Sequence, residues 1–147
     1  MIKIRPAQYT DIEALLHLLE ALFSIEQDFT PDREKQRRGL EMLLQAPEAY
    51  VVVAEHTGEI AGMATLQLLI STAEGAPSGL IEDVVVDESH RGQGIGEALM
   101  NHLITWVEKK GVTRLQLLAD RDNQPALEFY RKQGWETTSL IALRKKP

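Results

Sequence analysis

The hydrophobic and polar positions at the start of the chain follow two periods in turn. Apolar and charged residues alternate over residues 2–5, which predicts a short strand that Pro6 ends. From Ile12 to Phe23 the apolar residues recur at helical spacing, and Thr10 and Glu13 have the spacing of a capping box before that helix. The chain therefore begins with a strand followed by a helix.

The middle of the chain predicts a second helix and a pair of strands. Between Pro31, which suits a first helical position, and Pro47 the apolar spacing is again helical. Residues 49–55 and 60–70 are rich in β-branched and apolar side chains and flank a turn, so they predict an antiparallel hairpin. A loop over residues 75–79 follows.

The rest of the chain predicts strands that alternate with helices. The strand at residues 80–87 leads through a helix to a strand at residues 113–119, which should lie parallel to it. Asn123 can cap a short helix, and residues 135–143 read as a last strand. The order predicts one α/β domain over residues 1–147, with a mixed, mostly antiparallel sheet and helices on both of its faces.

Six residues between the strand at 80–87 and its helix carry three glycines at alternate positions. Glycines leave the backbone amides uncovered, and the helix start adds the positive end of its dipole, so a diphosphate can bind to N–H groups. Arg91 adds a fixed cation at the rim. The alternative is a tight turn without a ligand, which three alternate glycines disfavour. The predicted phosphate-binding segment is Arg91, Gly92, Gln93, Gly94, Ile95 and Gly96.

Composition and charge narrow the classes of function. The chain has 147 residues, of which 44% are hydrophobic, and a formal net charge of -6. This charge argues against nucleic acid as a partner and suits a cationic small molecule. The absence of cysteine excludes disulfides, thiolate metal sites and a cysteine nucleophile. Without a membrane-spanning run or a signal-peptide pattern, we expect a cytoplasmic protein that has no membrane partner.

Other kinds of site have weaker support in the sequence. The four histidines are scattered and do not pair at metal-ligand spacing, so we expect no metal. No Gly-x-Ser-x-Gly elbow is present, which leaves a serine hydrolase without its nucleophile. A dinucleotide site is the nearest enzyme alternative, because Asp120 follows the strand after the glycines, but the glycine spacing does not fit that fingerprint.

The segment from Val84 to Gly96, together with Asn123 and Tyr130, resembles the GNAT superfamily of acetyl-CoA-dependent N-acetyltransferases. The acetyl-CoA signature of that family is Arg or Gln, two residues, Gly, one residue, then Gly or Ala, and Arg91 begins a complete match. Fold likeness alone would be weak evidence. The resemblance implies the GNAT fold and acetyl-CoA as cosubstrate. The Glu-Asp pair at residues 82–83 is most similar to the diamine and polyamine acetyltransferase branch.

The resemblance also implies where coenzyme A binds. The diphosphate would bind the segment 91–96, and pantetheine would pair like a strand with the backbone of Val84, Val85 and Val86. This pairing requires the strands on either side of the site to splay apart. A backbone N–H of the same strand would stabilise the thioester oxygen, and Asn123 would contact coenzyme A in addition to capping its helix.

Catalysis requires a base and an acid, because an amine with a pKa near 10 arrives protonated. Glu82 is the candidate base or substrate anchor; strand alternation puts Asp83 on the opposite face unless a bulge intervenes. The resemblance assigns Tyr130 to protonate the departing thiolate, against a packing role as the alternative. Glu26 or Asp28 could hold a second ammonium, although a solvated acidic loop is an equal alternative.

These observations predict an enzyme that transfers an acetyl group from acetyl-CoA to a primary amine of a small-molecule acceptor, by direct attack on the thioester. A non-catalytic acyl-CoA-binding or regulatory module and a protein or peptide N-acetyltransferase are the alternatives. The resemblance further implies a homodimer as one form of assembly.

Overall fold

The structure, a computed structural model, describes residues 1–25 and 30–147 and falls into two compact units, Met1–Leu117 and Leu118–Pro147. The single domain that the sequence predicts stays a prediction. In chain order the elements are β1 (Ile2–Pro6), η1 (Tyr9–Asp11), α1 (Ile12–Ile25), α2 (Arg33–Gln45), β2 (Ala49–His56), β3 (Glu59–Ser71), β4 (Ala76–Val86), η2 (Glu88–His90), α3 (Ile95–Lys109), β5 (Leu115–Leu117) and α4 (Gln124–Lys132).

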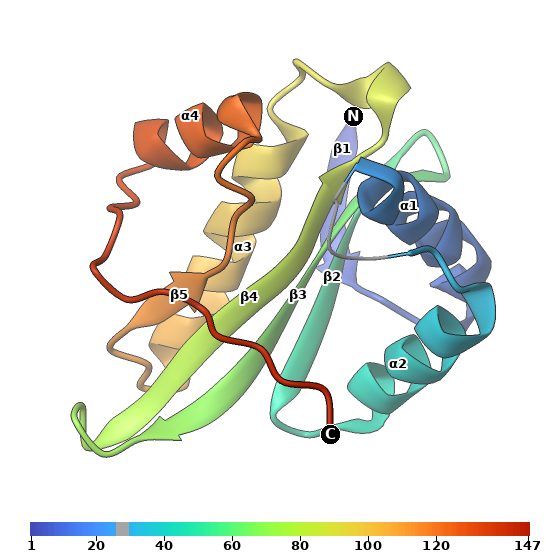
Figure 1. Ribbon diagram of the computed structural model, residues 1–147. Helices are drawn as coiled ribbons and strands as arrows, with labels where there is room; N and C mark the ends of the chain where they lie inside the picture. Colours follow the sequence, from blue (N-terminus) through green and yellow to red (C-terminus); the bar gives the residue numbers. More distant parts are fainter. Residues whose placement is uncertain (26–29) are drawn as a thin grey trace. The chain divides into compact units, whose positions relative to one another are not determined.

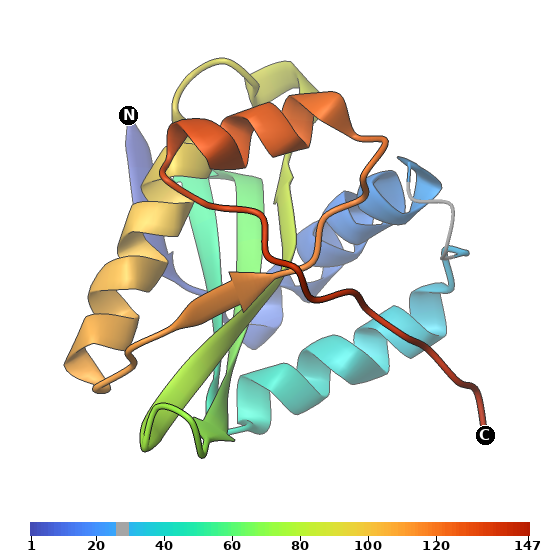
Figure 2. The same ribbon diagram turned by 60° about the vertical axis from the view of Figure 1, so that its left-hand side comes forward.

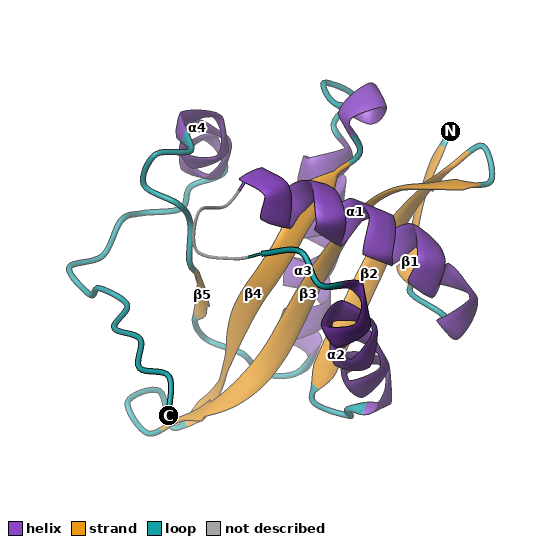
Figure 3. Cartoon of the chain, turned by 45° about the vertical axis from the view of Figure 1, so that its right-hand side comes forward, coloured by secondary structure: helices purple, strands orange, loops and turns teal. Residues whose placement is uncertain are grey.

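The first unit is a twisted sheet whose strands lie in the order β1-β2-β3-β4-β5 (Figure 1). Neighbouring strands are antiparallel except β4 and β5, which are parallel. Helices α1 and α2 cover one face, and α3 covers the other (Figures 2 and 3). This arrangement confirms the predicted mixed α/β class and the predicted parallel pair around α3.

Both faces of the sheet bury apolar side chains, which is the main source of the stability of this unit. On the α3 face, an added Cβ on Gly62 would lie 3.1 Å from Ile95 and 3.2 Å from Leu99, so glycine lets the helix approach the sheet closely. The core on the α1 and α2 face consists of Ile12, Leu15, Leu16, Leu18, Leu19, Leu40, Val51, Val53, Met63 and Val85.

Several predicted boundaries are wrong by a few residues. The loop predicted at residues 75–79 is mostly strand, because β4 begins at Ala76 and the turn of the hairpin ends at Gly75, whose φ is 62°. Pro77 is tolerated because β5 pairs with β4 only from Gly79 onward, so β4 is an edge strand at that point. β5 is correspondingly shorter than predicted.

The predicted caps of the first two helices are also wrong. Asp11, rather than Thr10 with Glu13, closes the start of the first helical segment, since its carboxylate accepts a hydrogen bond of 2.8 Å from the Gln8 N–H. Asp32 caps α2, accepting from the Lys35 N–H at 3.2 Å, and so Pro31 precedes the helix. At both ends an aspartate carboxylate, rather than the neighbouring candidates, accepts the hydrogen bond of the cap.

The last predicted strand, residues 135–143, is absent from the second unit. After α4 the described chain contains no further strand, and Leu140 and Ile141 are 74% and 76% exposed. A strand requires a neighbouring backbone to bond with, and this segment has no ladder partner within its own unit.

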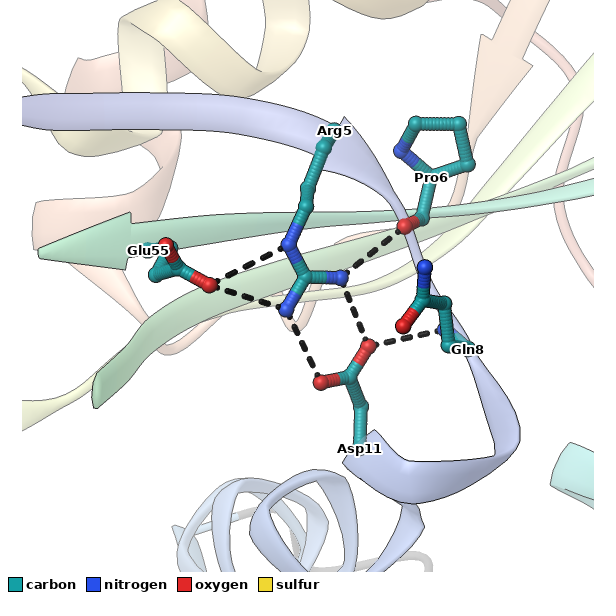
Figure 4. Close-up of polar contacts among 5 residues, drawn as sticks. All are labelled: Arg5, Pro6, Gln8, Asp11 and Glu55. Carbon is teal, nitrogen blue, oxygen red and sulfur yellow. Dashed lines mark hydrogen bonds and ion pairs between the residues drawn. The ribbon is translucent and has the colours of Figure 1, made fainter. Parts of the chain in front are cut away.

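Arg5 joins three parts of the first unit (Figure 4). Its guanidinium donates to both carboxylate oxygens of Asp11, at 2.8 and 3.0 Å, and to Oε1 of Glu55, at 3.1 and 3.2 Å. The side chains of Arg5 and Asp11 are only 18% and 8% exposed. Hydrogen bonding from Arg5 holds the pKa of Asp11 below its ordinary value although burial opposes this. The network ties β1 to β2 and to the start of α1.

Replacing Arg5 with Met should lower the free energy of unfolding by about 3 kcal/mol, because Asp11 would be left as a buried, unpaired charge. The matched control, Arg33→Met, removes an exposed pair with Glu13 and should change it by less than about 1 kcal/mol. Urea denaturation at pH 7 measures both. Because folding lowers the pKa of Asp11, the Arg5 contribution is full above about pH 5 and is lost as the carboxylate protonates at lower pH. Equal losses in the two variants would contradict the account.

Candidate functional site

β4 loses its partner on one side where the candidate site begins. β5 pairs with Gly79, Leu80 and Ile81 and then ends at Leu117, so the ladder between the two strands stops at Ile81. β5 therefore makes no backbone pairs with residues Glu82 to Val86, along the edge of β4 that faces away from β3. This is the splay that the sequence predicts, and it leaves strand hydrogen-bonding groups available to an extended ligand.

The opposite edge of the same stretch contains a β-bulge. Met63 pairs with Val85 and Thr65 pairs with Glu82, which leaves Asp83 and Val84 together opposite Ala64. Asp83 has a φ of 54°, in the left-handed region that non-glycine residues other than Asn and Asp seldom adopt. A bulge bends its strand, increases its twist and redirects side chains.

The bulge places both adjacent carboxylates against one pocket, so the alternation that would separate them does not apply. Asp83 lines the pocket beside Leu19 of α1 and Leu40 of α2, on the face where Val85 packs into the core. Glu82 shares the face of its partner Thr65. The pocket has a volume of about 290 Å³, and its lining consists of Leu19, Phe23, Thr30, Asp32, Lys35, Gln36, Gly39, Leu40, Leu43, Glu82 and Asp83.

The two carboxylates differ in environment. Glu82 is exposed, whereas Asp83 is mostly buried. The hydroxyl of Thr65, itself 2% exposed, lies 2.9 Å from the Glu82 carbonyl oxygen and 3.0 Å from Oδ2 of Asp83. Burial raises the pKa of Asp83 to about 6; the Thr65 hydrogen bond opposes the increase and the charge of Glu82 adds to it. Asp83 is thus a carboxylate that titrates close to neutral pH.

The glycine-rich turn has the backbone conformation expected of an anion site. Gly92 and Gly94 have φ values of 77° and 79°, and Gly94 is the N-cap of α3. The first helical hydrogen bond, 3.0 Å from the Ala98 N–H to the Gly94 carbonyl, leaves the N–H groups of the first turn without helical acceptors. Arg91 is exposed beside the turn, and its Nε donates to the Val86 carbonyl at 3.3 Å.

In the second unit, Asn123 caps α4 as predicted, because its side chain accepts from the Ala126 N–H at 3.2 Å. Tyr130 lies on the same helix, with its ring centroid 5.2 Å from that of Phe129 and 6.1 Å from that of Trp135. These contacts account for packing within the unit. The role of Tyr130 toward the thiolate and that of Asn123 toward coenzyme A stay predictions.

A larger pocket of about 480 Å³ in the first unit has a different character. Most of its ionisable groups already bind one another: Arg5 pairs with Asp11 and Glu55, and His90 pairs with Asp87 at 2.9 Å. In the described part of the chain, by contrast, no ion pair engages Glu82 or Asp83. The smaller pocket therefore has charge available for a ligand.

Among residues 1–25 and 30–147, no three histidine or acidic side chains gather as a metal site would require. None of the helices in this part of the chain is both long and apolar enough to cross a membrane.

Comparison with known proteins identifies the family. The acetyltransferase (GNAT) family matches residues 12–135, and the chain belongs to this family. It is 27% identical over 140 residues to an uncharacterised N-acetyltransferase of Methanocaldococcus jannaschii, a match that covers 94% of the chain and 62% of that protein. It is 40% identical over 80 residues to a glucosamine 6-phosphate N-acetyltransferase of Trypanosoma brucei brucei, covering 54% of the chain and 52% of that protein.

A solved structure provides a comparison over nearly the full chain. An aminoglycoside acetyltransferase from an uncultured soil metagenomic sample is 27% identical, with a TM-score of 0.78 over 99% of this chain and 95% of that one. The chain thus resembles a whole acetyltransferase domain. It spans only about half to three fifths of the length of the two curated relatives above.

The sequence did not identify every residue of the site. Thr65 could not be singled out, because a threonine within a predicted strand is ordinary. Asp83 was not chosen, because the alternation of side chains along a strand places it on the face opposite Glu82. Both emerge from the bulge, which a single sequence does not reveal. Glu26 and Asp28, the candidates for a second ammonium site, lie outside the described residues.

Replacing Gly94 with Ala should destabilise the protein by about 1 kcal/mol, because alanine is strained at a φ of 79°. Gly39 is the matched control: it lies within α2 with open space where a Cβ would be added, and Gly39→Ala should stabilise by about 0.5 to 1 kcal/mol. Urea unfolding of the two variants measures the difference. A loss in both variants would show that the turn is not the cause.

Proposed function

We propose that this protein transfers an acetyl group from acetyl-CoA to a primary amine of a small-molecule acceptor. The observation that carries the proposal is the conjunction of the glycine turn at the start of α3 with the open edge of β4. Membership of the GNAT family supports the same reaction. The amine attacks the thioester directly, without an acyl-enzyme intermediate.

Coenzyme A binds along the path that these two features define. Its diphosphate accepts hydrogen bonds from the amides of residues 92–96, with Arg91 as a counter-charge. Gln93 and Ile95 contribute backbone N–H groups alone. The pantetheine amides pair with the backbone of Val84 and Val86, on the edge that β5 leaves unpaired.

In this proposal the thioester carbonyl group of acetyl-CoA lies next to the bulge of β4. Bulged residues are not fully paired to the neighbouring strand, so an N–H group between Val84 and Val86 is available to bind the developing oxyanion. Val85 contributes its buried side chain to the core, which fixes this stretch of backbone. Asn123 adds a contact to coenzyme A.

The acceptor occupies the 290 Å³ pocket, whose lining residues come from α1, α2 and β4 and from the residues just before α2. Its size is at the lower end for ligand pockets, which favours a small molecule or a single residue of a peptide. Acidic groups at the pocket suit an ammonium, and the apolar side chains of α1 and α2 suit its carbon skeleton. Glu26 and Asp28 are proposed as additional contacts for a second ammonium.

The acceptor class is broader than the diamine and polyamine branch alone. The named relatives act on an amino sugar phosphate and on aminoglycosides, which supports amines that carry several polar groups. Diamines remain in the proposal because of the Glu-Asp pair at residues 82–83. A protein or peptide N-terminus is the alternative, and a non-catalytic acyl-CoA-binding module is a second one.

Two side chains are proposed to assist the transfer. Glu82 acts as a base or as an anchor for the acceptor ammonium, and Tyr130 protonates the thiolate of coenzyme A as it leaves. No metal takes part. We propose a cytoplasmic location and a single domain, in keeping with the sequence.

Arg91→Ala should weaken coenzyme A binding by about 10- to 150-fold, because a charge-assisted contact to phosphate contributes about 1.5 to 3 kcal/mol. Isothermal titration calorimetry of the protein with coenzyme A measures the change. Arg38→Ala, which removes an exposed arginine of α2, is the control and should leave the affinity unchanged. An equal loss in both variants would indicate only a general effect of net charge.

Thiol release from acetyl-CoA, followed with a panel of amines, tests the function itself. Diamines, amino sugars, aminoglycosides and peptides with free N-termini are compared, and we expect turnover with at least one small amine. Tyr130→Phe should lower kcat by about 100-fold, the usual contribution of general acid catalysis. Binding of acetyl-CoA without thiol release across the panel would favour the non-catalytic module, and turnover confined to peptides would favour the protein acceptor.

A further inference from the structure

The 290 Å³ pocket contains two adjacent carboxylates, and only one of them has the surroundings of a proton acceptor. Glu82 is exposed and makes no hydrogen bond or ion pair through its carboxylate within the described residues. Asp83 is largely withdrawn from solvent, and a buried neighbour fixes one of its oxygens. An efficient base has a defined position and a proton affinity near the working pH.

Thr65 defines the position of the Asp83 carboxylate. Its hydroxyl, buried in β3, lies within hydrogen-bond distance of Oδ2 of Asp83 and of the Glu82 carbonyl. It therefore links β3 to both of these residues of β4 at the bulge. In the described residues, the hydrogen bonds of Asp83 involve Oδ2 alone. Oδ1 is therefore available to a group that enters the pocket.

The cost of this arrangement argues against a purely structural role for Asp83. A carboxylate buried for stability is usually paired with a cation, as Asp11 is with Arg5. Asp83 has no such partner in the described chain. A largely buried carboxylate without a cation beside it is typical of functional sites.

We propose that Asp83, rather than Glu82, accepts the proton of the acceptor ammonium, and that Thr65 is the positioning residue that holds its carboxylate. This inference rests on the proposed function. In the first step one N–H bond of the ammonium breaks and its proton passes to Oδ1 of Asp83. The free amine then forms the C–N bond, the C–S bond breaks, and the nitrogen loses a second proton as the thiolate gains one. Asp83 finally releases its proton to water.

The charged groups around the pocket are consistent with this step. Glu82 on β4 and Asp32 at the start of α2 attract the ammonium, while Lys35 on α2 is the one cation among the described lining residues. Leu19 and Phe23 of α1 contribute no charge. The negative charge of Glu82 also raises the pKa of Asp83, which makes Asp83 the stronger base.

Paired amide substitutions test the assignment, because both preserve side-chain shape. Asp83→Asn should lower kcat/KM at pH 7 by about 100-fold or more, whereas Glu82→Gln should lower it by less than about tenfold. Asparagine also tolerates a positive φ. Since folding raises the pKa of Asp83 to about 6, stability falls as the pH rises from about 4 to about 6 and stays lower above that, so Asp83→Asn should melt at a higher temperature than the parent protein at pH 7.5 but not at pH 4.

Thr65 provides a second test that does not depend on removing the carboxylate. Thr65→Val preserves the shape but removes the hydrogen bond that holds the pKa of Asp83 down, so the acidic limb of the kcat/KM profile should move to higher pH. Thr65→Ser retains the hydroxyl and should restore the parent profile. A merely structural threonine would change the melting temperature without moving this limb.

The experiments distinguish a failure of the proposed function from a failure of the assignment of Asp83 as the base. If the parent protein releases no thiol with any amine, the proposed function fails and the assignment of Asp83 fails with it. If the parent is active but Glu82→Gln causes the larger loss, or Thr65→Val leaves the acidic limb in place, the assignment is wrong and the function stands. The expected order of losses together with the shifted limb supports both.

Discussion

β4 carries one residue more than the stretch of β3 beside it, and this extra residue determines what the candidate site contains. It places Asp83 and Val84 opposite a single alanine, brings two carboxylates to one face and leaves backbone groups unpaired. The end of β5 at Leu117 opens the other edge of the same stretch. An acyl donor that pairs with the open edge and an acceptor that enters between α1 and α2 would meet at the bulge, so the two irregularities together produce a place for chemistry.

The surroundings of Asp11, which is buried, and of Asp83, which is partly buried, differ in the first unit. Asp11 receives hydrogen bonds from Arg5, which lower its pKa, and the network joins β1, β2 and the start of α1. Asp83 receives a single hydroxyl from Thr65, and burial raises its pKa to about 6. The first arrangement stabilises the fold at neutral pH, and the second lowers stability at the residue for which we propose the role of base. Paired groups elsewhere in the unit, such as Arg5 with Asp11, offset the stability that is lost at Asp83.

The sequence predicted those features that depend on local chemistry. Helical spacing located α1 and α3, the alternate glycines located the turn with positive φ at Gly92 and Gly94, and Asn123 was recognised as a cap. The bulge was missed because register depends on the pairing of β3 with β4, which no local pattern records. The strand predicted at residues 135–143 is absent for a related reason. β propensity in these residues does not show whether a partner strand is present to pair with them.

The central claim is that the backbone of the glycine turn binds the diphosphate of coenzyme A beside the open edge of β4. Amide chemical shifts of the 15N-labelled protein, titrated with coenzyme A, test it directly. The account predicts that the largest changes fall on residues 92–96, with a second group at Val84 and Val86. Changes centred on the 480 Å³ pocket around Arg5, with the glycine turn unaffected at saturation, would contradict it.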